Sequence, residues 1–214
     1  MYRALLWDHD GVLVDTEKFY FQANREILAE VGAVLSEADY RRYLLVAGTG
    51  VWHLAAERGC SADDIAALKR RRDERYRQLL LVEDVAVAGI SELLAALHSR
   101  VRMAIVTSSQ RAHFDAIHSR TDLPRYFELI LAREDYRLSK PDPEPYTTAL
   151  TRLQLSAAEC LVIEDSERGL SAAKAAGLSC WVIPSALTRD SNFSAAERRF
   201  DDLAALRRAL LDNL

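Results

Sequence analysis

Residues 4–11 read Ala4-Leu5-Leu6-Trp7-Asp8-His9-Asp10-Gly11, so a short apolar run stops at two acids and a glycine. This pattern predicts a buried strand over residues 2–7 that delivers carboxylates to a loop. Two acids two positions apart around a sharp turn can take different roles. One can bind a hard cation or attack an electrophile, while the other carries a proton. Three later segments of the chain repeat this layout.

Beyond residue 87 the chain alternates between helical and strand patterns. Strands are expected at 102–106, 129–132, 160–163 and 179–183, with helices at 90–99, 112–120, 144–153, 168–176 and 202–211. Strands that alternate with helices predict a parallel sheet with helices on both faces. The predicted fold class is therefore α/β.

The region between the first strand and this alternation contains helical patterns and no convincing strand. Helices are expected over about 17–31, over 51–58 and from 61 to about 80. Another is expected to begin at the capping-box sequence 36–39. We predict an all-helical insert over 16–86, with 1–15 and 87–214 forming the sheet domain. The basic run Lys69–Arg72 inside the insert is interpreted as a solvated helix face.

Composition limits the classes of function. The chain has 214 residues, 50% of them hydrophobic and 28% charged, with a formal net charge of -4. This mild acidity offers no general attraction for nucleic acid or anionic membranes, so neither is an expected partner. Three widely spaced cysteines without a CxxC pair indicate reduced thiols. Without an apparent signal peptide or membrane span, a cytoplasmic location is expected.

Polar residues follow each of the main strands. Thr107 and Ser108 come after 102–106, Glu164 and Asp165 after the strand beginning at residue 160, and Lys140 lies in a proline-rich turn between them. Ligands of such sheets bind outside the carboxyl ends of the strands. We therefore expect these groups to converge with Asp8 and Asp10 at one edge.

That set of groups suits phosphoryl transfer. Mg²⁺ held by Asp8 and Asp165 would screen the repulsion between a phosphate ester and an attacking carboxylate. Lys140 and the Thr107 hydroxyl would hold the other phosphoryl oxygens, helped by backbone N–H groups such as that of Ser108.

The two acids of the opening turn receive different roles. Asp8 would attack phosphorus and give an aspartyl-phosphate. Asp10 would protonate the leaving alcohol and then deprotonate the water that hydrolyses the intermediate. The predicted substrate is a small phosphorylated metabolite.

The motifs resemble those of the haloacid dehalogenase-like hydrolase superfamily. Its four motifs are matched, in order, by Asp8–Thr16, Thr107, Lys140 and Glu164-Asp165, while Ser166, Gly169 and residues 172–177 are similar to its β-phosphoglucomutase/phosphoglycolate phosphatase branch. The resemblance implies a Rossmann-like core, a small helical cap between the first two motifs, and Mg²⁺. It also implies a metal site at Asp8, Asp165 and the backbone carbonyl of Asp10, and we add Glu164 as a candidate ligand.

Alternative functions remain open. A β-phosphoglucomutase-like sugar phosphomutase is disfavoured because residues 47–51 lack the cap arginine of the family mutases. Asp10 argues against a haloacid dehalogenase, which lacks this proton shuttle. Motif order and length disfavour a phospho-receiver binding module, and a catalytically dead interaction protein would lack a motif residue. Taken singly, a helix-cap or loop role would explain Thr107 or Lys140 equally well.

Three features carry no assignment from sequence. The side chain of His9 is expected to point away from the chemistry. Cap residues 48–52, Arg25 and Arg77 are candidates for contact with the leaving group, but residue type does not identify the substrate. The oligomeric state is not readable from the sequence.

Overall fold

The computed structural model describes residues 2–81 and 85–214 of the chain. The chain divides into two compact units, Met1–Asp15 with Ala86–Leu214 and, separately, Thr16–Val85. We call them the sheet unit and the helical unit. The roles of catalytic core and cap predicted for them stay predictions. No helix among the described residues is long and apolar enough to cross a membrane.

The sheet unit contains a six-stranded parallel sheet in the order β3-β2-β1-β4-β5-β6. The strands are Ala4–Trp7 (β1), Arg102–Val106 (β2), Leu129–Leu131 (β3), Cys160–Glu164 (β4), Ser179–Val182 (β5) and Arg198–Arg199 (β6). The predicted α/β, Rossmann-like fold is confirmed. The sequence pattern does not predict β6, because that strand consists of two exposed arginines.

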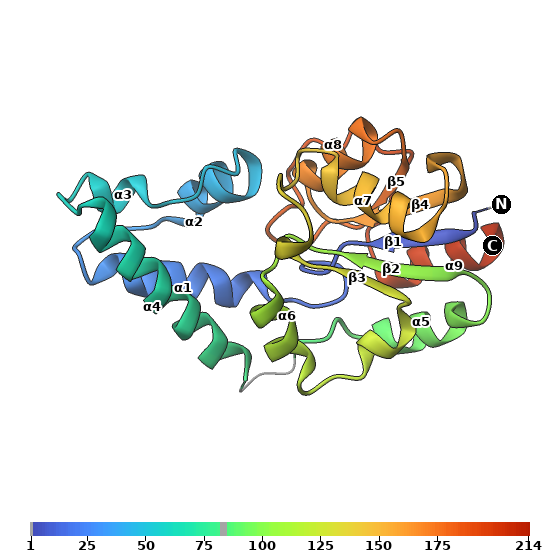
Figure 1. Cartoon of the computed structure of the whole chain (residues 1–214), viewed down its shortest axis with the longest axis horizontal. Coiled ribbons are helices and arrows are strands. Elements are labelled where there is room, and N and C mark those ends of the chain that lie inside the picture. The colour runs from blue at the N-terminus through green and yellow to red at the C-terminus, as the bar shows by residue number, and fades with distance from the viewer. Residues whose placement is uncertain (1, 82–84) are drawn as a thin grey trace. The chain divides into compact units, whose positions relative to one another are not determined.

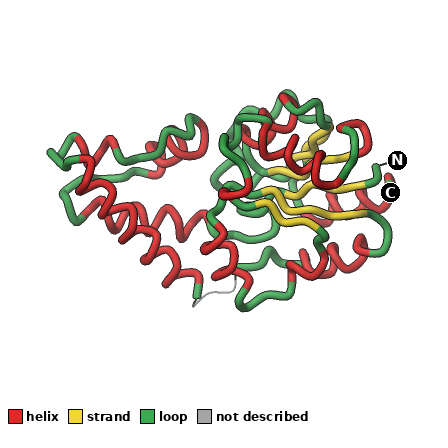
Figure 2. The backbone as a smooth tube through the Cα atoms, in the orientation of Figure 1, coloured by secondary structure: helices red, strands yellow, loops and turns green. Residues whose placement is uncertain are grey.

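Helices cover both faces of this sheet (Figure 1; strands in yellow in Figure 2). On one face lie α7 (Glu144–Leu153) and α8 (Glu167–Ala175), and on the other lie α5 (Ile90–His98), α6 (Arg111–His118) and α9 (Leu203–Asn213). Short 3₁₀ turns cover Leu123–Tyr126, Arg133–Asp135 and Ala157–Glu159. Leu6 and Val162 of the sheet pack in one buried cluster with Tyr146 of α7 and Leu170 of α8. Burial of this apolar surface is the main force that holds the layers together.

Strand register brings the predicted polar residues to one edge. Trp7 of β1 lies level with Ile105 of β2 and Ile163 of β4. The next residue, Asp8, therefore lies level with Val106 and Glu164, and its backbone N–H donates to the carbonyl of Ile163 (2.9 Å). The strand order reverses between β1 and β4, which is where open α/β sheets bind ligands.

The helical unit contains α1 (Glu17–Ala29), α2 (Glu37–Asp39), a π-helix over Tyr40–Val46, α3 (His53–Ala56) and α4 (Ala62–Leu80). Figure 2 shows only helices and loops in its described part, as the sequence predicts. A capping box of Ser61 and Asp64 begins α4. Leu28 of α1 and Leu68 of α4 share a buried core with Leu35 and Tyr40.

Arg72 is an exception to the predicted solvated face at 69–72. Its side chain is buried, donates to Asn24 Oδ1 (2.9 Å), and lies over the rings of Tyr20 (4.5 Å) and Trp52 (5.5 Å). The reason is its spacing, because Leu68, Arg72 and Tyr76 recur every four residues on the inner face of α4. The interpretation of this arginine as exposed is wrong.

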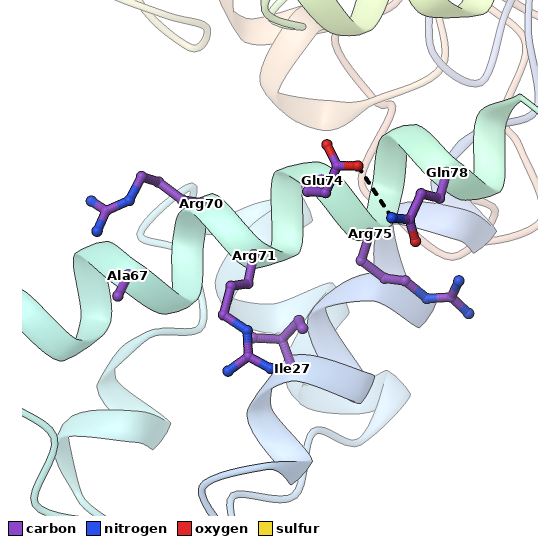
Figure 3. A pocket seen from close by; sticks show the side chains of 7 residues that line it. All are labelled: Ile27, Ala67, Arg70, Arg71, Glu74, Arg75 and Gln78. Atoms are coloured by element: carbon purple, nitrogen blue, oxygen red, sulfur yellow. Dashed lines mark hydrogen bonds between the residues drawn. The ribbon is translucent and has the colours of Figure 1, made fainter.

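The outer face of α4 forms a groove of about 510 Å³ with Ile27 of α1 (Figure 3). Among the arginines that line it, Arg71 pairs with Glu30 and Arg75 with Glu26, both at 2.6 Å. Exposed pairs of this kind are typical of a solvated helix face. We therefore interpret Arg71 and Arg75 as part of a solvated helix face.

Candidate active site

Lys140 connects three strand ends of the sheet unit. Its Nζ donates to Asp8 Oδ1 (2.5 Å), Glu164 Oε1 (2.7 Å) and the carbonyl oxygen of Val106 (2.9 Å). Lys140 lies in the loop before α7, whereas its acceptors lie at the ends of β1, β4 and β2. The side chains of Lys140, Asp8 and Glu164 are 4%, 12% and 0% exposed, so the ion pairs are held away from solvent. This lysine fixes the two carboxylates relative to the sheet.

Glu164 is a buried anchor with five donors. Its Oε1 accepts from Lys140 and from the Tyr146 hydroxyl (2.9 Å). Its Oε2 accepts from the backbone N–H groups of Asp165 and Ser166 (3.1 Å each) and from the Ser166 hydroxyl (3.0 Å). The same hydroxyl accepts from the backbone N–H of Gly169 and caps α8. Glu164 thus ties the end of β4 to the start of α8.

Gly169 has no side chain, and the Glu164 carboxylate fills the space where its Cβ would lie. A Cβ at this position would lie 1.7 Å from Glu164 Oε1 and 1.9 Å from its Cδ. Gly169 is in the first turn of α8, where alanine ordinarily favours a helix over glycine. Glycine is favoured over alanine here because a Cβ would clash with the Glu164 carboxylate, which its hydrogen-bond partners hold in place.

We expect Gly169→Ala to lower the free energy of unfolding by about 2 kcal/mol or more, the cost of overpacking a filled site. Ser171→Ala is the matched control, because Ser171 is exposed on the same helix. It should change stability by about 0.5 kcal/mol or less. Urea denaturation followed by circular dichroism measures both variants. A Gly169→Ala protein as stable as the control would show that Glu164 can move aside.

Asp165 lies against the opening turn. A Cβ on Gly11, whose φ is +87°, would lie 2.3 Å from Asp165 Oδ2. Glycine is therefore required there by both the left-handed backbone and the close approach. Thr188, which is buried, donates to the same carboxylate oxygen (3.2 Å). The motif around Asp165 and the motif around Asp8 are thus in direct contact.

Asp10 receives three donors on one oxygen. Its Oδ2 accepts from the hydroxyls of Ser109 (2.8 Å) and Thr107 (3.2 Å) and lies 3.2 Å from Nδ1 of His9. Ser109 follows the same strand as Thr107 and Ser108, but it is not among the substrate-binding residues predicted from the sequence. Ser108 itself is exposed.

The buried cluster carries excess negative charge. One oxygen from each of Asp8, Glu164 and Asp165 lies within 4.8 Å of the others, and Lys140 contacts Asp8 and Glu164. Burial raises the pKa of Asp8 to about 8, and the charge of Glu164 adds to this effect, whereas Lys140 opposes it. Burial also lowers the pKa of Lys140, but Asp8 and Glu164 outweigh it and raise that pKa above its usual value.

This donor set fits a hard divalent cation. Carboxylate oxygens are the ligands that Mg²⁺ prefers, and a divalent charge would neutralise the excess on the cluster. Asp8 and Asp165 have the best access, because the oxygens of Glu164 are already occupied by protein donors. Glu164 lies close enough to share a metal ion with Asp8 and Asp165, but its donors favour a supporting role.

His9 points into the sheet unit and is fully buried. Its Nε2 lies 2.9 Å from Nε2 of His118, at the end of α6, while its Nδ1 faces Asp10. The expectation that this side chain turns away from the chemistry does not match its contact with Asp10. No motif pointed to His118, because histidines 109 residues apart have no readable spacing.

Comparisons with known protein families, sequences and structures all point to the same protein family. Residues 5–183 match the family model described as haloacid dehalogenase-like hydrolase. Protein CbbY of Rhodobacter capsulatus is 38% identical over 95% of this chain and 94% of its own length. The phosphorylated carbohydrates phosphatase of Thermotoga maritima is 33% identical over 82% of each chain. A crystal structure of CbbY from Rhodobacter sphaeroides with xylulose-(1,5)bisphosphate superposes with a TM-score of 0.82, at 30% identity over 96% of each chain.

Proposed function

Because the chain belongs to the haloacid dehalogenase-like hydrolases, in the branch of the β-phosphoglucomutases and phosphoglycolate phosphatases, we propose that it is a Mg²⁺-dependent phosphatase of a small phosphorylated sugar. The observation that carries the proposal is the buried contact of Lys140 with Asp8 and Glu164, next to Asp165. The names of the relatives, a phosphorylated carbohydrates phosphatase among them, support the substrate class.

Mg²⁺ would be held by Asp8, Asp165 and the backbone carbonyl of Asp10. Bound there, it supplies positive charge that neutralises the cluster and the phosphate. Glu164 would keep Lys140 and the Asp165 loop in position through its five donors.

Asp8 would act as the nucleophile. A bond forms between one of its carboxylate oxygens and phosphorus while the phosphorus–oxygen bond to the sugar breaks. Lys140, the Thr107 hydroxyl and the backbone N–H of Ser108 would bind the phosphoryl oxygens. Lys140 already contacts Asp8, so it would orient the nucleophile as well as the phosphate.

Asp10 would transfer the proton. It gives a proton to the leaving sugar oxygen in the first step. In the second step it takes a proton from the water that attacks phosphorus, which releases inorganic phosphate and regenerates Asp8. Its position at the turn after β1, two residues beyond Asp8, lets both carboxylates reach one phosphate ester.

The direct test incubates purified protein and Mg²⁺ with a panel of sugar phosphates that includes fructose 1-phosphate and xylulose 1,5-bisphosphate. We expect release of inorganic phosphate from at least one member, loss of activity with EDTA, and recovery with excess Mg²⁺. Product analysis separates the mutase alternative, which would return an isomeric sugar phosphate. No release from any member, or activity that survives EDTA, would contradict the proposal.

We expect Asp10→Asn to lower kcat by about 10²- to 10⁴-fold, the usual contribution of a general acid. The loss in kcat/KM, which reports the transfer of the phosphoryl group to Asp8, should be larger for alkyl phosphates than for 4-nitrophenyl phosphate, because the nitrophenolate leaves without a proton. Asp115→Asn, an exposed site on α6, is the matched control and should retain wild-type rates. Steady-state kinetics on both substrates measures the effect. An equal loss in kcat/KM on both would remove the role of Asp10 as the acid that protonates the leaving group.

A further inference from the structure

A chain of hydrogen bonds runs through the sheet unit from Thr121 to Asp10. The Thr121 hydroxyl lies 2.6 Å from Nδ1 of His118. Nε2 of His118 lies 2.9 Å from Nε2 of His9, and Nδ1 of His9 lies 3.2 Å from Asp10 Oδ2. The four groups come from the opening turn, the end of α6 and the loop that follows α6.

The acceptor at one end sets the direction of every bond. The Asp10 carboxylate oxygen can only accept, so His9 carries its proton on Nδ1. If His9 holds this one proton, its Nε2 accepts, which requires a proton on Nε2 of His118. The Nδ1 of His118 is then left as an acceptor, and the Thr121 hydroxyl donates to it. With one proton on each ring, a single tautomer of each satisfies the whole chain.

Packing holds the two rings in this arrangement. His9 is fully buried, and its ring lies 5.0 Å from both the Phe114 and the His118 rings. Phe114 and His118 are four residues apart on α6, so one helix face presents both rings to His9. Burial lowers the pKa of His118 to about 3, and proximity to His9 contributes, so this ring is neutral at neutral pH.

The donors on Asp10 distinguish its two oxygens. His9, Thr107 and Ser109 all approach Oδ2, which leaves no lone pair there for a carboxyl proton. When Asp10 is protonated, its proton is therefore directed to Oδ1. This is the oxygen from which the leaving group would be protonated.

We propose that His9 is a positioning residue, which orients the Asp10 carboxyl through a tautomer set by His118 and Thr121. The inference rests on the proposed function, since it assigns Asp10 the proton transfer. It adds a role for the residue between the two acids and for a helix outside the four motifs. His9 and His118 touch neither substrate nor phosphate in this role.

Nuclear magnetic resonance of protein labelled with ¹⁵N-histidine tests the chain without any turnover. We expect His9 to appear as the neutral Nδ1–H tautomer and His118 as the neutral Nε2–H tautomer at pH 7. In His118→Leu, His9 should lose its single tautomer. The opposite tautomers in wild type, a doubly protonated His9, or an unchanged His9 spectrum in His118→Leu would overturn the proposal.

Kinetics of paired variants tests the effect on Asp10. His118→Gln keeps a donor near the position of Nε2, and His9→Asn keeps one near Nδ1, whereas His118→Leu and His9→Leu remove them. With alkyl phosphates we expect the leucine variants to lose about 10- to 100-fold in kcat/KM, the scale of a misplaced catalytic group. The amide variants should recover most of the rate. With 4-nitrophenyl phosphate the leucine variants should lose less than about threefold in kcat/KM, because the nitrophenolate leaves without a proton.

The outcomes separate this inference from the proposed function. Equal losses in kcat/KM on both substrates, or no recovery in the amide variants, would overturn the positioning role and leave the phosphatase intact. If wild type releases no phosphate from any substrate, the proposed function fails, and with it the role of His9. The tautomer spectra still report on the hydrogen-bonded chain in that case. Thermal unfolding of each variant identifies any that lose rate by losing structure.

Discussion

Asp8→Asn is expected to lower kcat by at least about 10³-fold, with no Mg²⁺ concentration restoring it. The amide has nearly the same shape as the carboxylate but is a poor nucleophile. It also removes one of the oxygen anions of the cluster formed with Glu164 and Asp165. Initial rates of phosphate release on the best substrate of the panel measure the loss.

The same substitution should leave the fold intact or stabilise it. Burial and Glu164 raise the pKa of Asp8 from 3.8 to about 8, so the ionised form is disfavoured in the folded state. For an acid with a raised pKa, stability is full below the unfolded value and falls as the pH rises toward the folded value. In EDTA, Asp8→Asn should therefore gain stability relative to wild type, and the gain should be larger at pH 8 than at pH 5.

Urea denaturation at both pH values checks this expectation, with Asp115→Asn as the exposed control. Inactive protein of undiminished stability would separate a chemical role of Asp8 from a structural one. Substantial activity in Asp8→Asn would contradict the covalent route. Stability that falls below wild type at pH 8 would show that the Asp8–Lys140 contact outweighs the burial of the charge.

The sequence predicts the central strands of the sheet well because they are almost fully buried. Ala4–Trp7, Arg102–Val106 and Cys160–Glu164 are almost purely apolar runs that end at polar residues, and the polar residues mark the carboxyl ends. Because parallel strands end at the same edge of the sheet, the positions of the strand ends alone predict that Asp8, Thr107 and Glu164 lie close together.

The partners that come from other elements could not be predicted in this way. Tyr146 reaches Glu164 from α7, Thr188 reaches Asp165 from the loop after β5, and His118 reaches His9 from α6. Each contact depends on the packing of a helix or loop against the sheet, which strand periodicity does not encode. Arg72 is a different case. Its four-residue spacing from Leu68 indicates a position on the buried face of α4, but its charge favoured an exposed one.

Lys140→Met is expected to lower the free energy of unfolding by about 3–5 kcal/mol in EDTA, the cost of breaking a buried ion pair from one side. Methionine fills nearly the same volume, so the loss comes from charge and hydrogen bonding. Asp8 and Glu164 would each lose a donor, as would the carbonyl of Val106. Phosphate release should also fall by at least about 10²-fold, because a charged ligand of the phosphate is removed.

Lys174→Met is the matched control, since Lys174 pairs with Glu197 at 2.5 Å but is 39% exposed. An exposed pair contributes about 1 kcal/mol or less, so the two lysines should differ several-fold in effect. Urea denaturation with and without Mg²⁺ measures both. A loss at Lys140 no larger than at Lys174 would mean that water reaches the cluster.

A double-mutant cycle identifies the source of the loss at Lys140. Glu164→Gln removes one of the charges that Lys140→Met leaves uncompensated, so the double variant should be more stable than the sum of the single effects predicts. Addition of Mg²⁺ should recover part of the stability of Lys140→Met, because a divalent cation can neutralise the remaining carboxylates. Additive effects, with no response to Mg²⁺, would mean that Lys140 acts through packing alone and that the cluster does not hold the excess charge on which the metal site depends.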